Sequence, residues 1–396
     1  MGIKKLFVIS AFFLVSMAAH SQDAGSMLNA YMKSFARGSL STKIQVLQDS
    51  AKINGNDMCP LYLQAARFVK DNYFTLYDDS AAVELTLLTV RLAGLKGCGD
   101  TAGILWSLFE ESGQLQLKTE IISSLGAMDV SPAIVDKLNS WLKGVNDKKR
   151  NGEEFQEQLV MEMVNALGKL GRSSSFSVLF STGALKYSSE ITEKAVAALK
   201  KLDADYTGSL IAILENGRIE DKHAVLELVT KDPDMDDESK GKVLKAALEE
   251  SLKNVDSAAD NEKRLLRELR LGAVEELTPL HWSAAGDLAV KSFDITLEEV
   301  ESGLVTKTRL VEVINFLGSV KNHEAAVRLS SYLEVLNSRK ESGQPVNTKV
   351  VIAVIENLST IGDKTAFDNL LYAGYLDYPA SVKQAAREAL NNLKSP

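Results

Sequence analysis

Apolar residues recur at helical spacing along most of the chain. Across Leu159–Leu170 they fall at relative positions i, i+1, i+4, i+5, i+8 and i+11, which places them on one broad stripe of a helix. Gly171 follows this stripe, where a left-handed cap favours glycine. The serines at 173–175 can then begin a second helix that runs to about Leu185. The pattern predicts a unit of two helices joined by a tight turn.

This predicted unit occurs again near the end of the chain. The segment Leu138–Leu202 aligns without a gap to Leu329–Leu393, a shift of 191 residues. Many of the identities fall on apolar and glycine positions, as a shared packing geometry would require. These pairs include Leu167/Leu358, Gly171/Gly362, Phe176/Phe367, Leu179/Leu370, Gly183/Gly374, Leu185/Leu376, Tyr187/Tyr378, Ala198/Ala389 and Leu199/Leu390. A shorter spacing of 32 residues separates Ala166-Leu167 from Ala198-Leu199. The sequence therefore predicts a duplicated array of helix-pair repeats.

Two kinds of segment interrupt the spacing. The stretches 144–153 and 337–347 are polar and contain glycine, so we interpret them as loops inserted between repeats. The region 203–307 keeps apolar residues at helical spacing, with breakers at Asp232-Pro233, Thr278-Pro279 and Gly286. We interpret this region as diverged repeats that keep one stack continuous. The alternative is two short solenoids joined by a helical linker.

The repeated segments carry a family resemblance. The sequences VNALGKLGRSSSFSVLF and LDYPASVKQAAREALNNL resemble HEAT-like repeats of the short bacterial kind, which place Ala-Leu-Gly near the end of a first helix and Asp in the turn before the next. The residues that fit this turn-and-helix pattern are Asp377, Pro379, Val382, Ala386, Ala389 and Leu390. Ser359 and Asn391 replace the expected glycine, and Lys186 stands at the duplicate position of Asp377. The resemblance covers 83–202 and 308–393.

The resemblance implies an all-α fold, an α/α solenoid of stacked helix pairs that forms an elongated, curved array. Residues 22–57 would form an N-terminal helical cap, 58–202 HEAT-like repeats, 203–307 diverged repeats and 308–396 the C-terminal HEAT-like repeats. One helix pair cannot bury its apolar stripe alone, so neighbouring repeats must stack to form a continuous core. Only 7 prolines occur in the chain, which agrees with a helical fold. Such arrays suit extended protein partners, although a fold does not fix a function.

The N-terminus has the features of a secretory signal. Lys4 and Lys5 precede an apolar run, Leu6–Val15, and small residues follow up to Ser21. We predict that residues 1–21 are a cleaved signal peptide and that the mature chain begins at Gln22. The alternative, a membrane anchor, is disfavoured because this run is too short to cross about 30 Å of hydrocarbon as a helix. The predicted location is periplasmic or secreted, in a bacterial envelope.

Net charge limits the class of partner, and the cysteine content predicts a disulfide. Removing residues 1–21 removes two lysines and no acid, so 45 basic residues become 43 against 53 acidic ones, a net charge of −10. This balance disfavours nucleic acid, whose binding depends on neutralised phosphates. Cys59 and Cys98 are the two cysteines of the chain. In an oxidising compartment they are predicted to form a disulfide, the alternative being two buried free thiols.

The sequence lacks the motifs of common catalytic sites. It has no Gly-x-Ser-x-Gly, no Walker loop and no Gly-x-Gly-x-x-Gly after a predicted strand. His223, His281 and His323 are too far apart in sequence to pair on one helical turn. The acidic stretch 232–238 has Asp237 where a calcium loop needs glycine, and we interpret it as the start of a helix. We therefore predict no catalytic, cofactor-binding or metal-binding residues, and no enzyme.

Four residues are candidate partner contacts. Arg267 and Arg270 belong to a basic stripe that shares its predicted helix with several glutamates, so a solvated face is favoured over docking of an acidic partner. His281 and Trp282 follow Pro279 outside the matched repeats and could contact a partner from the surface. The remaining aromatic residues are assigned to packing: Tyr187 and Tyr378 in the turns between repeats, Trp106 and Trp141 in the core.

Together these features predict an exported, non-catalytic helical-repeat scaffold that mediates protein–protein interaction in the cell envelope. Two alternatives stay open. One is an enzyme with its site in the diverged region 203–307. The other is a carrier that binds a lipid or a glycan between helices.

Overall fold

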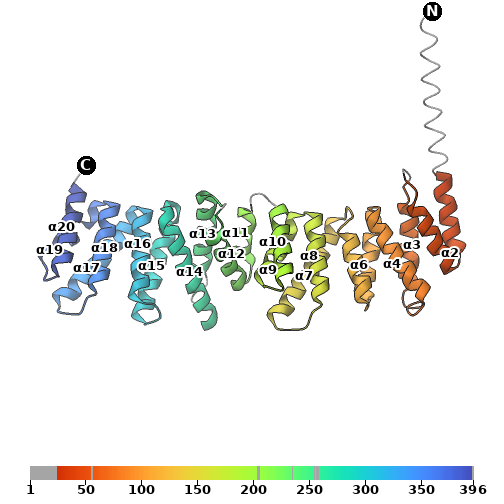
Figure 1. Ribbon diagram of the computed structural model, residues 1–396. Coiled ribbons are helices and arrows are strands. Elements are labelled where there is room, and N and C mark those ends of the chain that lie inside the picture. The colour runs from red at the N-terminus through yellow and green to blue at the C-terminus, as the bar shows by residue number, and fades with distance from the viewer. Residues whose placement is uncertain are drawn as a thin grey trace, which may run out of the picture. The chain divides into compact units, whose positions relative to one another are not determined.

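The computed structural model describes residues 25–54, 57–202, 206–233, 235–253, 255 and 258–394. In these ranges the regular structure is helical and no strand occurs (Figure 1). The predicted all-α fold is confirmed as an α solenoid of packed helix pairs. The predicted signal peptide, residues 1–21, lies outside the described residues. The chain divides into two compact units, Met1–Ala204 and Asp205–Pro396, and each is described by itself.

Unit 1 consists of consecutive helix pairs in two rows. Helical residues 25–37 come first and fall, with α2, in the region predicted as the cap. The helices that follow are α2 (Leu40–Ala51), α3 (Cys59–Asn72), α4 (Ser80–Leu95), α5 (Ala102–Glu111), α6 (Leu115–Leu125), α7 (Pro132–Arg150), α8 (Glu157–Leu170), α9 (Phe176–Ala184) and α10 (Ser189–Leu202). Each even-numbered helix packs against the next even one, and the odd-numbered helices from α3 to α9 form the second row.

Small residues bring the helices of the even-numbered row close together. A Cβ atom on Gly126, which caps α6, would lie 2.6 Å from the Cα of Ala166 in α8, so only glycine fits there. The same relation holds one repeat later, where a Cβ on Gly168 would lie 2.9 Å from the Cβ of Ala198 in α10. The Ala-Leu-Gly pattern therefore has a packing cause: its glycine is the site of contact with the next repeat.

Unit 2 has the same two-row arrangement. Its helices are α11 (Thr207–Asn216), α12 (Ile219–Lys231), α13 (Asp237–Leu252), α14 (Asp260–Leu280), α15 (Gly286–Glu301), α16 (Lys307–Val320), α17 (His323–Glu341), α18 (Thr348–Ile361), α19 (Phe367–Tyr375) and α20 (Ala380–Lys394). Helices α12 to α20 form the even-numbered row, and α11 to α19 form the odd-numbered row. Helix pairing thus continues through residues 206–307, where the sequence resembles the repeats least.

The duplication appears in the helix bounds themselves. Helices α7, α8 and α9 begin and end 191 residues before α17, α18 and α19, and the short 3-10 turns Ser173–Ser175 and Lys364–Ala366 also correspond. Gly171 and Gly362 both end their helices in the left-handed conformation, with φ of 63° and 75°. The prediction of glycine caps at these two positions is confirmed.

Three boundaries differ from the predictions. The stretches 144–153 and 337–347 were predicted as loops, but α7 continues to Arg150 and α17 to Glu341. Val145, inside the first stretch, is buried, and so are Leu336, just before the second stretch, and Asn337, its first residue. The predicted break at Pro279 is also displaced, because this proline lies inside the last turn of α14. The helix ends instead at Leu280 and is capped by His281, which adopts a left-handed conformation with φ of 49°.

Candidate functional site

The structure does not bring the predicted contact residues to one exposed surface. Arg270 is 1% exposed, and its guanidinium donates to the Glu299 carboxylate on α15. Burial lowers the pKa of Arg270, and the charge of Glu299 opposes this change. Arg267 donates from Nε to Glu299 Oε1 at 2.8 Å. Arg270 as a surface contact is therefore wrong, because the side chain is enclosed in an ion pair between helices.

His281 and Trp282 lie in different surroundings. His281 is exposed and forms the cap of α14. Trp282 is half-buried and packs against α13, where a Cβ atom on Gly241 would lie 2.4 Å from the indole Cε3. The position of the indole therefore depends on glycine at 241. Trp282 is better described as a packing residue than as a free contact.

The two cysteines connect a helix pair at one end. Cys59 begins α3, and Cys98 follows α4. Their sulfurs are bonded in the structure, with the Cα atoms 5.3 Å apart. The bond joins the start of α3 to the end of α4, so it restrains one end of this antiparallel pair. The oxidation state of the thiols in the cell stays a prediction.

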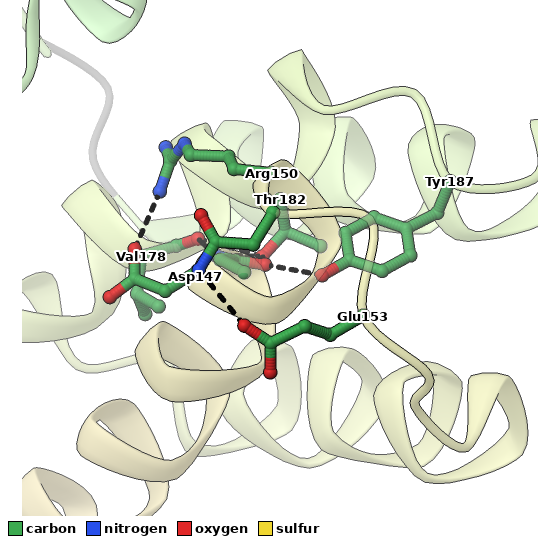
Figure 2. Close-up of polar contacts among 8 residues, drawn as sticks. Asp147, Arg150, Glu153, Val178, Thr182 and Tyr187 are labelled. Carbon is green, nitrogen blue, oxygen red and sulfur yellow. Dashed lines mark hydrogen bonds and ion pairs between the residues drawn. The ribbon is translucent and has the colours of Figure 1, made fainter.

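A buried asparagine joins three segments of unit 1, and its partners Val178, Thr182 and Tyr187 are labelled in Figure 2. Asn146, near the end of α7, is 1% exposed. Its amide Nδ2 donates to the Val178 carbonyl at 3.3 Å and to Thr182 Oγ1 at 3.1 Å, both on α9. The Tyr187 hydroxyl donates to Asn146 Oδ1 at 2.9 Å from the turn before α10. We call these residues the Asn146 clasp, since they hold α9 and the following turn against α7.

The loop after α7 packs against the same tyrosine. The Phe155 ring contacts the Tyr187 ring edge-on, with centroids 5.1 Å apart, and the Lys149 ammonium lies 5.3 Å from the Tyr187 centroid. Burial raises the pKa of Tyr187 far above its ordinary value. In the second copy burial raises the pKa of Tyr378 to about 12, and its hydroxyl donates to the Leu336 carbonyl at 3.0 Å. The assignment of both tyrosines to packing in the turns agrees with these contacts.

Sequence reasoning missed the asparagine. Asn337 corresponds to Asn146 after the shift of 191 residues, and its Nδ2 donates to the Asn369 carbonyl at 3.0 Å. The signal was present in the alignment as a polar identity at 146 and 337. It was overlooked because both residues fall in segments interpreted as loops. A polar residue retained in both copies among apolar identities would have indicated a buried hydrogen bond.

The most exposed aromatic side chains of unit 1 lie at the other end of the α3–α4 pair. A small pocket opens between the end of α3, the connection 73–79, and the starts of α4 and α6. We call it the α3–α4 groove, and its lining includes Phe68, Tyr73, Leu76, Tyr77, Val83 and Leu87. Its volume is about 20 Å³, which is room for one water-sized group. Beside it, Phe74 is 71% exposed and Tyr77 is 47% exposed.

Fixed contacts hold this groove in shape. The Tyr73 hydroxyl donates to Ser112 Oγ at 2.8 Å, and Tyr73 is 8% exposed. The Tyr73 ring meets Phe74 and Tyr77 edge-on, with centroids 5.3 and 6.2 Å apart. The exposed rings therefore rest on a buried, hydrogen-bonded ring. Aromatic side chains fixed in this way contribute contact area at low entropic cost.

The surroundings of the groove are acidic. The exposed residues next to its lining in sequence include Asp71, Asp78 and Glu84. The structure shows no ion pair for these three among the residues it describes. The nearby Lys70 is already paired with Glu111 at 2.7 Å. The exposed Arg67 stands next to Phe68 of the lining, so the exposed charges beside the lining are three acids and one base. The α3–α4 groove thus combines exposed aromatic rings with an excess of acidic side chains.

The described ranges contain no cluster of three or more His, Cys, Asp or Glu side chains that could hold a metal ion. Among them, no helix is both long and apolar enough to cross a membrane.

Comparison with known proteins leaves the family open. No family model matches the chain, and no curated protein matches its sequence. Among solved structures it is similar to an engineered protein, with 16% identity over 93% of this chain and 99% of the other, at a TM-score of 0.32. It is also similar to a chain from work on a phosphorylation switch that controls the interaction between cadherin and beta-catenin, with 12% identity over 94% and 96% of the two chains and a TM-score of 0.30. A circular tandem repeat protein gives 13% identity over 99% and 78%, at a TM-score of 0.16. At these scores we draw no functional conclusion from the likenesses.

Proposed function

We propose that this protein is an exported, non-catalytic scaffold of HEAT-like repeats that binds protein partners in a bacterial envelope. The observation that carries the proposal is the α3–α4 groove, where Phe74 and Tyr77 are exposed on a helix pair held at its other end by the Cys59–Cys98 bond. Large aromatic side chains gathered at the surface are typical of protein-binding sites. The two-row packing of each unit supports the scaffold part of the proposal, because it supplies a firm base for such a surface.

The charge around the groove defines the partner. Asp71, Asp78 and Glu84 attract cationic groups, while the pocket has room for one methyl-sized end of an apolar side chain. The partner is therefore a protein segment that carries an apolar side chain next to lysine or arginine. Opposite charges at the edge of an interface mainly accelerate association, so binding should weaken as salt is raised.

The binding surface is tested by cross-linking in living cells. A photoreactive residue replaces Phe74, or, as the matched control, Tyr375 on α19, which is 78% exposed and lies outside the groove. The expected result is a stable cross-linked protein from the Phe74 position that is absent from the Tyr375 position. Recovery of the protein alone from both positions would contradict the proposal.

A variant separates loss of binding from loss of fold. The double substitution Phe74→Ser and Tyr77→Ser should abolish the cross-linked complex formed through a third groove position, Val83. It should leave the helical circular dichroism spectrum unchanged, because both residues lie in the connection between α3 and α4, with Phe74 largely exposed and Tyr77 about half exposed. Tyr375→Ser is the control for removing an exposed ring, and the complex should survive it.

Export is tested separately. Fractionation of the native host should place the protein in the periplasm or the medium, and N-terminal sequencing should give Gln22 as the first residue. Protein that stays in the cytoplasm and retains Met1 would show that the predicted export is wrong. Binding at the groove would then be decided by the cross-linking result alone.

A further inference from the structure

Unit 2 contains a larger cavity that the proposed function does not use. It lies between α15, α16, α17 and the loop that leads into α18, and its volume is about 160 Å³. Its apolar wall is formed by Leu297, Val300, Leu310, Leu336, Val346 and Val350. The cavity is bounded on several sides by these elements and open on another.

The duplication gives an internal reference for this cavity. After the shift of 191 residues, Tyr332, Val346 and Val350 correspond to Trp141, Phe155 and Leu159 of unit 1, so each position carries a smaller side chain in the second copy. In unit 1 the Trp141 ring packs edge-on against Phe109 at 5.7 Å, and the Phe155 ring packs against Tyr187 at 5.1 Å. Reduced side-chain volume at corresponding positions explains why space is left in unit 2.

A difference in helix length also contributes to the cavity of unit 2. Helix α15 has 16 residues and α5 has 10. Leu297 and Val300, in the last two turns of α15, therefore supply a wall that a helix as short as α5 does not reach. The cavity depends on features that distinguish the two copies rather than on the repeat pattern they share.

Polar groups in the cavity are few and unevenly charged. Tyr332 is 5% exposed, and in the part of the chain that the structure describes no hydrogen-bond partner is found for its hydroxyl. Arg339 is paired with Glu301 at 3.1 Å, and Lys307, also in the lining, makes no ion pair within the described ranges. Two cations and one carboxylate leave the cavity with a net positive charge beside an apolar wall.

Burial and the charges around Tyr332 set the protonation state of its hydroxyl. Burial raises the pKa of this hydroxyl, Arg339 and Arg328 oppose the change, and Glu301 adds to it. The hydroxyl is therefore protonated at neutral pH and can donate a hydrogen bond. The hydroxyl oxygen is not among the buried side-chain atoms that lack a partner, so it stays accessible to water and can exchange that water for an acceptor on a ligand.

We propose that this cavity binds a small monocarboxylate with a short unbranched alkyl chain. The chain lies against the leucine and valine wall. The carboxylate lies at Lys307 and Arg339, and it accepts a hydrogen bond from Tyr332. A volume of about 160 Å³ suits several methylene groups rather than a full-length acyl chain. The inference does not depend on the α3–α4 groove or on a protein partner.

The test uses the full mature chain and sodium octanoate as the probe, with binding measured by isothermal titration calorimetry at low salt. Octanoate should bind at one site per chain, whereas 1-octanol and octylamine should bind at least about tenfold more weakly, because they lack the negative charge. Absence of octanoate binding at millimolar concentration, or equal binding of the three compounds, would overturn the proposal.

Variants locate the site. Val346→Phe installs the residue found at the corresponding position of unit 1 and should abolish binding by filling the cavity. Tyr332→Phe keeps the ring and removes the donor, and Lys307→Ala removes the free cation; each should weaken octanoate binding about tenfold. Lys349→Ala removes an exposed cation outside the lining and should leave the affinity unchanged.

Folding is checked in the same samples by thermal melting. If Val346→Phe has a lower melting temperature than the natural protein, the octanoate affinities of Tyr332→Phe and Lys307→Ala test the proposal, because neither substitution adds volume. Unchanged affinity in both of these variants would overturn the proposal even if octanoate binds, because the binding would then lie elsewhere on the chain.

Discussion

Asn146 and Asn337 make the same hydrogen bond 191 residues apart: each donates its side-chain amide to a main-chain carbonyl of the short helix that follows in its row, at 3.3 and 3.0 Å. Both side chains are 1% exposed. The two environments differ in the partners of the side-chain oxygen and in Thr182, which contacts Asn146 and is Ala373 in the second copy. Asn146 Oδ1 accepts from Tyr187, whereas Asn337 Oδ1 is buried without a partner among the described residues.

Replacing Asn146 with Ala should destabilise unit 1 by about 2–3 kcal/mol. The change leaves the Tyr187 hydroxyl without its partner and removes one of the donors to the Val178 carbonyl, which keeps the Thr182 hydroxyl, and an unsatisfied buried group carries the full cost of desolvation. Urea unfolding followed by circular dichroism measures the loss. Asn165→Ala, at a half-buried position of α8, is the control and should change stability by less than about 1 kcal/mol. Equal effects of the two substitutions would contradict the clasp.

The second copy offers the converse experiment. Thr182, which contacts Asn146, corresponds to Ala373, so Ala373→Thr places a hydroxyl next to the unpaired Asn337 Oδ1. We expect unit 2 to gain about 0.5–1.5 kcal/mol, the usual net value of one hydrogen bond. Ala373→Val adds the same volume without the hydroxyl and should destabilise, because this position is 0% exposed. If Thr destabilised as much as Val, hydrogen bonding would not be the cause.

The sequence predicted the helix pairs and their duplication well, because apolar spacing and glycine caps are local signals. Gly171 and Gly362 were located correctly for this reason. Prediction from the sequence failed where the role of a side chain depends on a helix distant in the chain. Arg270 looks like a surface residue from its neighbours in α14, and only the position of Glu299 on α15 shows why it is buried. The sequence did not indicate the α3–α4 groove for the same reason, because its lining comes from three helices and a connection.

The length of the loop closed by the disulfide predicts a large effect of this bond on stability. Cys59 and Cys98 are 39 residues apart, and closing a loop of this size stabilises by about 4 kcal/mol in the chain-entropy model. Reduction, or the double substitution Cys59→Ala and Cys98→Ala, should therefore lower the melting temperature of unit 1. Thiol titration of the native protein in denaturant without reductant is the direct check. Two free thiols in protein isolated from its native compartment would contradict the bond.

The buried ion pair in unit 2 should be sensitive to loss of its acid. Glu299→Gln removes the carboxylate that faces both Arg267 and Arg270, and it leaves the Arg270 charge enclosed without compensation. We expect a loss of about 3–5 kcal/mol, as is usual when one partner of a buried pair is removed. Glu268→Gln, in the exposed pair with Arg264, should cost less than about 1 kcal/mol. Urea unfolding of the two variants side by side distinguishes the cases.

Glu250 should make unit 2 sensitive to acid. Its carboxylate lies between Lys222 at 2.9 Å and Lys253 at 2.5 Å, and its side chain is 10% exposed. Burial alone would raise the pKa of Glu250, but hydrogen bonds from Lys253 and Lys222, with their charges, outweigh it and hold the pKa below its ordinary value. The unfolded chain then binds the proton more readily than the folded one. The stabilisation is fully present above the unfolded pKa of about 4.3 and is lost as the pH falls through the lower folded pKa.

Hydrogen exchange of peptides from α12 and α13 can follow this loss locally. Glu250→Gln should reduce protection at pH 7, and its difference from the natural protein should shrink as the pH falls below about 4, since protonation removes the same charge. Glu238→Gln, in an exposed pair with Lys242, should instead follow the natural protein across the range. A Glu250→Gln deficit that stayed constant down to pH 2 would show that packing of the side chain matters there and its charge does not. The ion pairs with Lys222 and Lys253 would then contribute nothing to the acid sensitivity of unit 2.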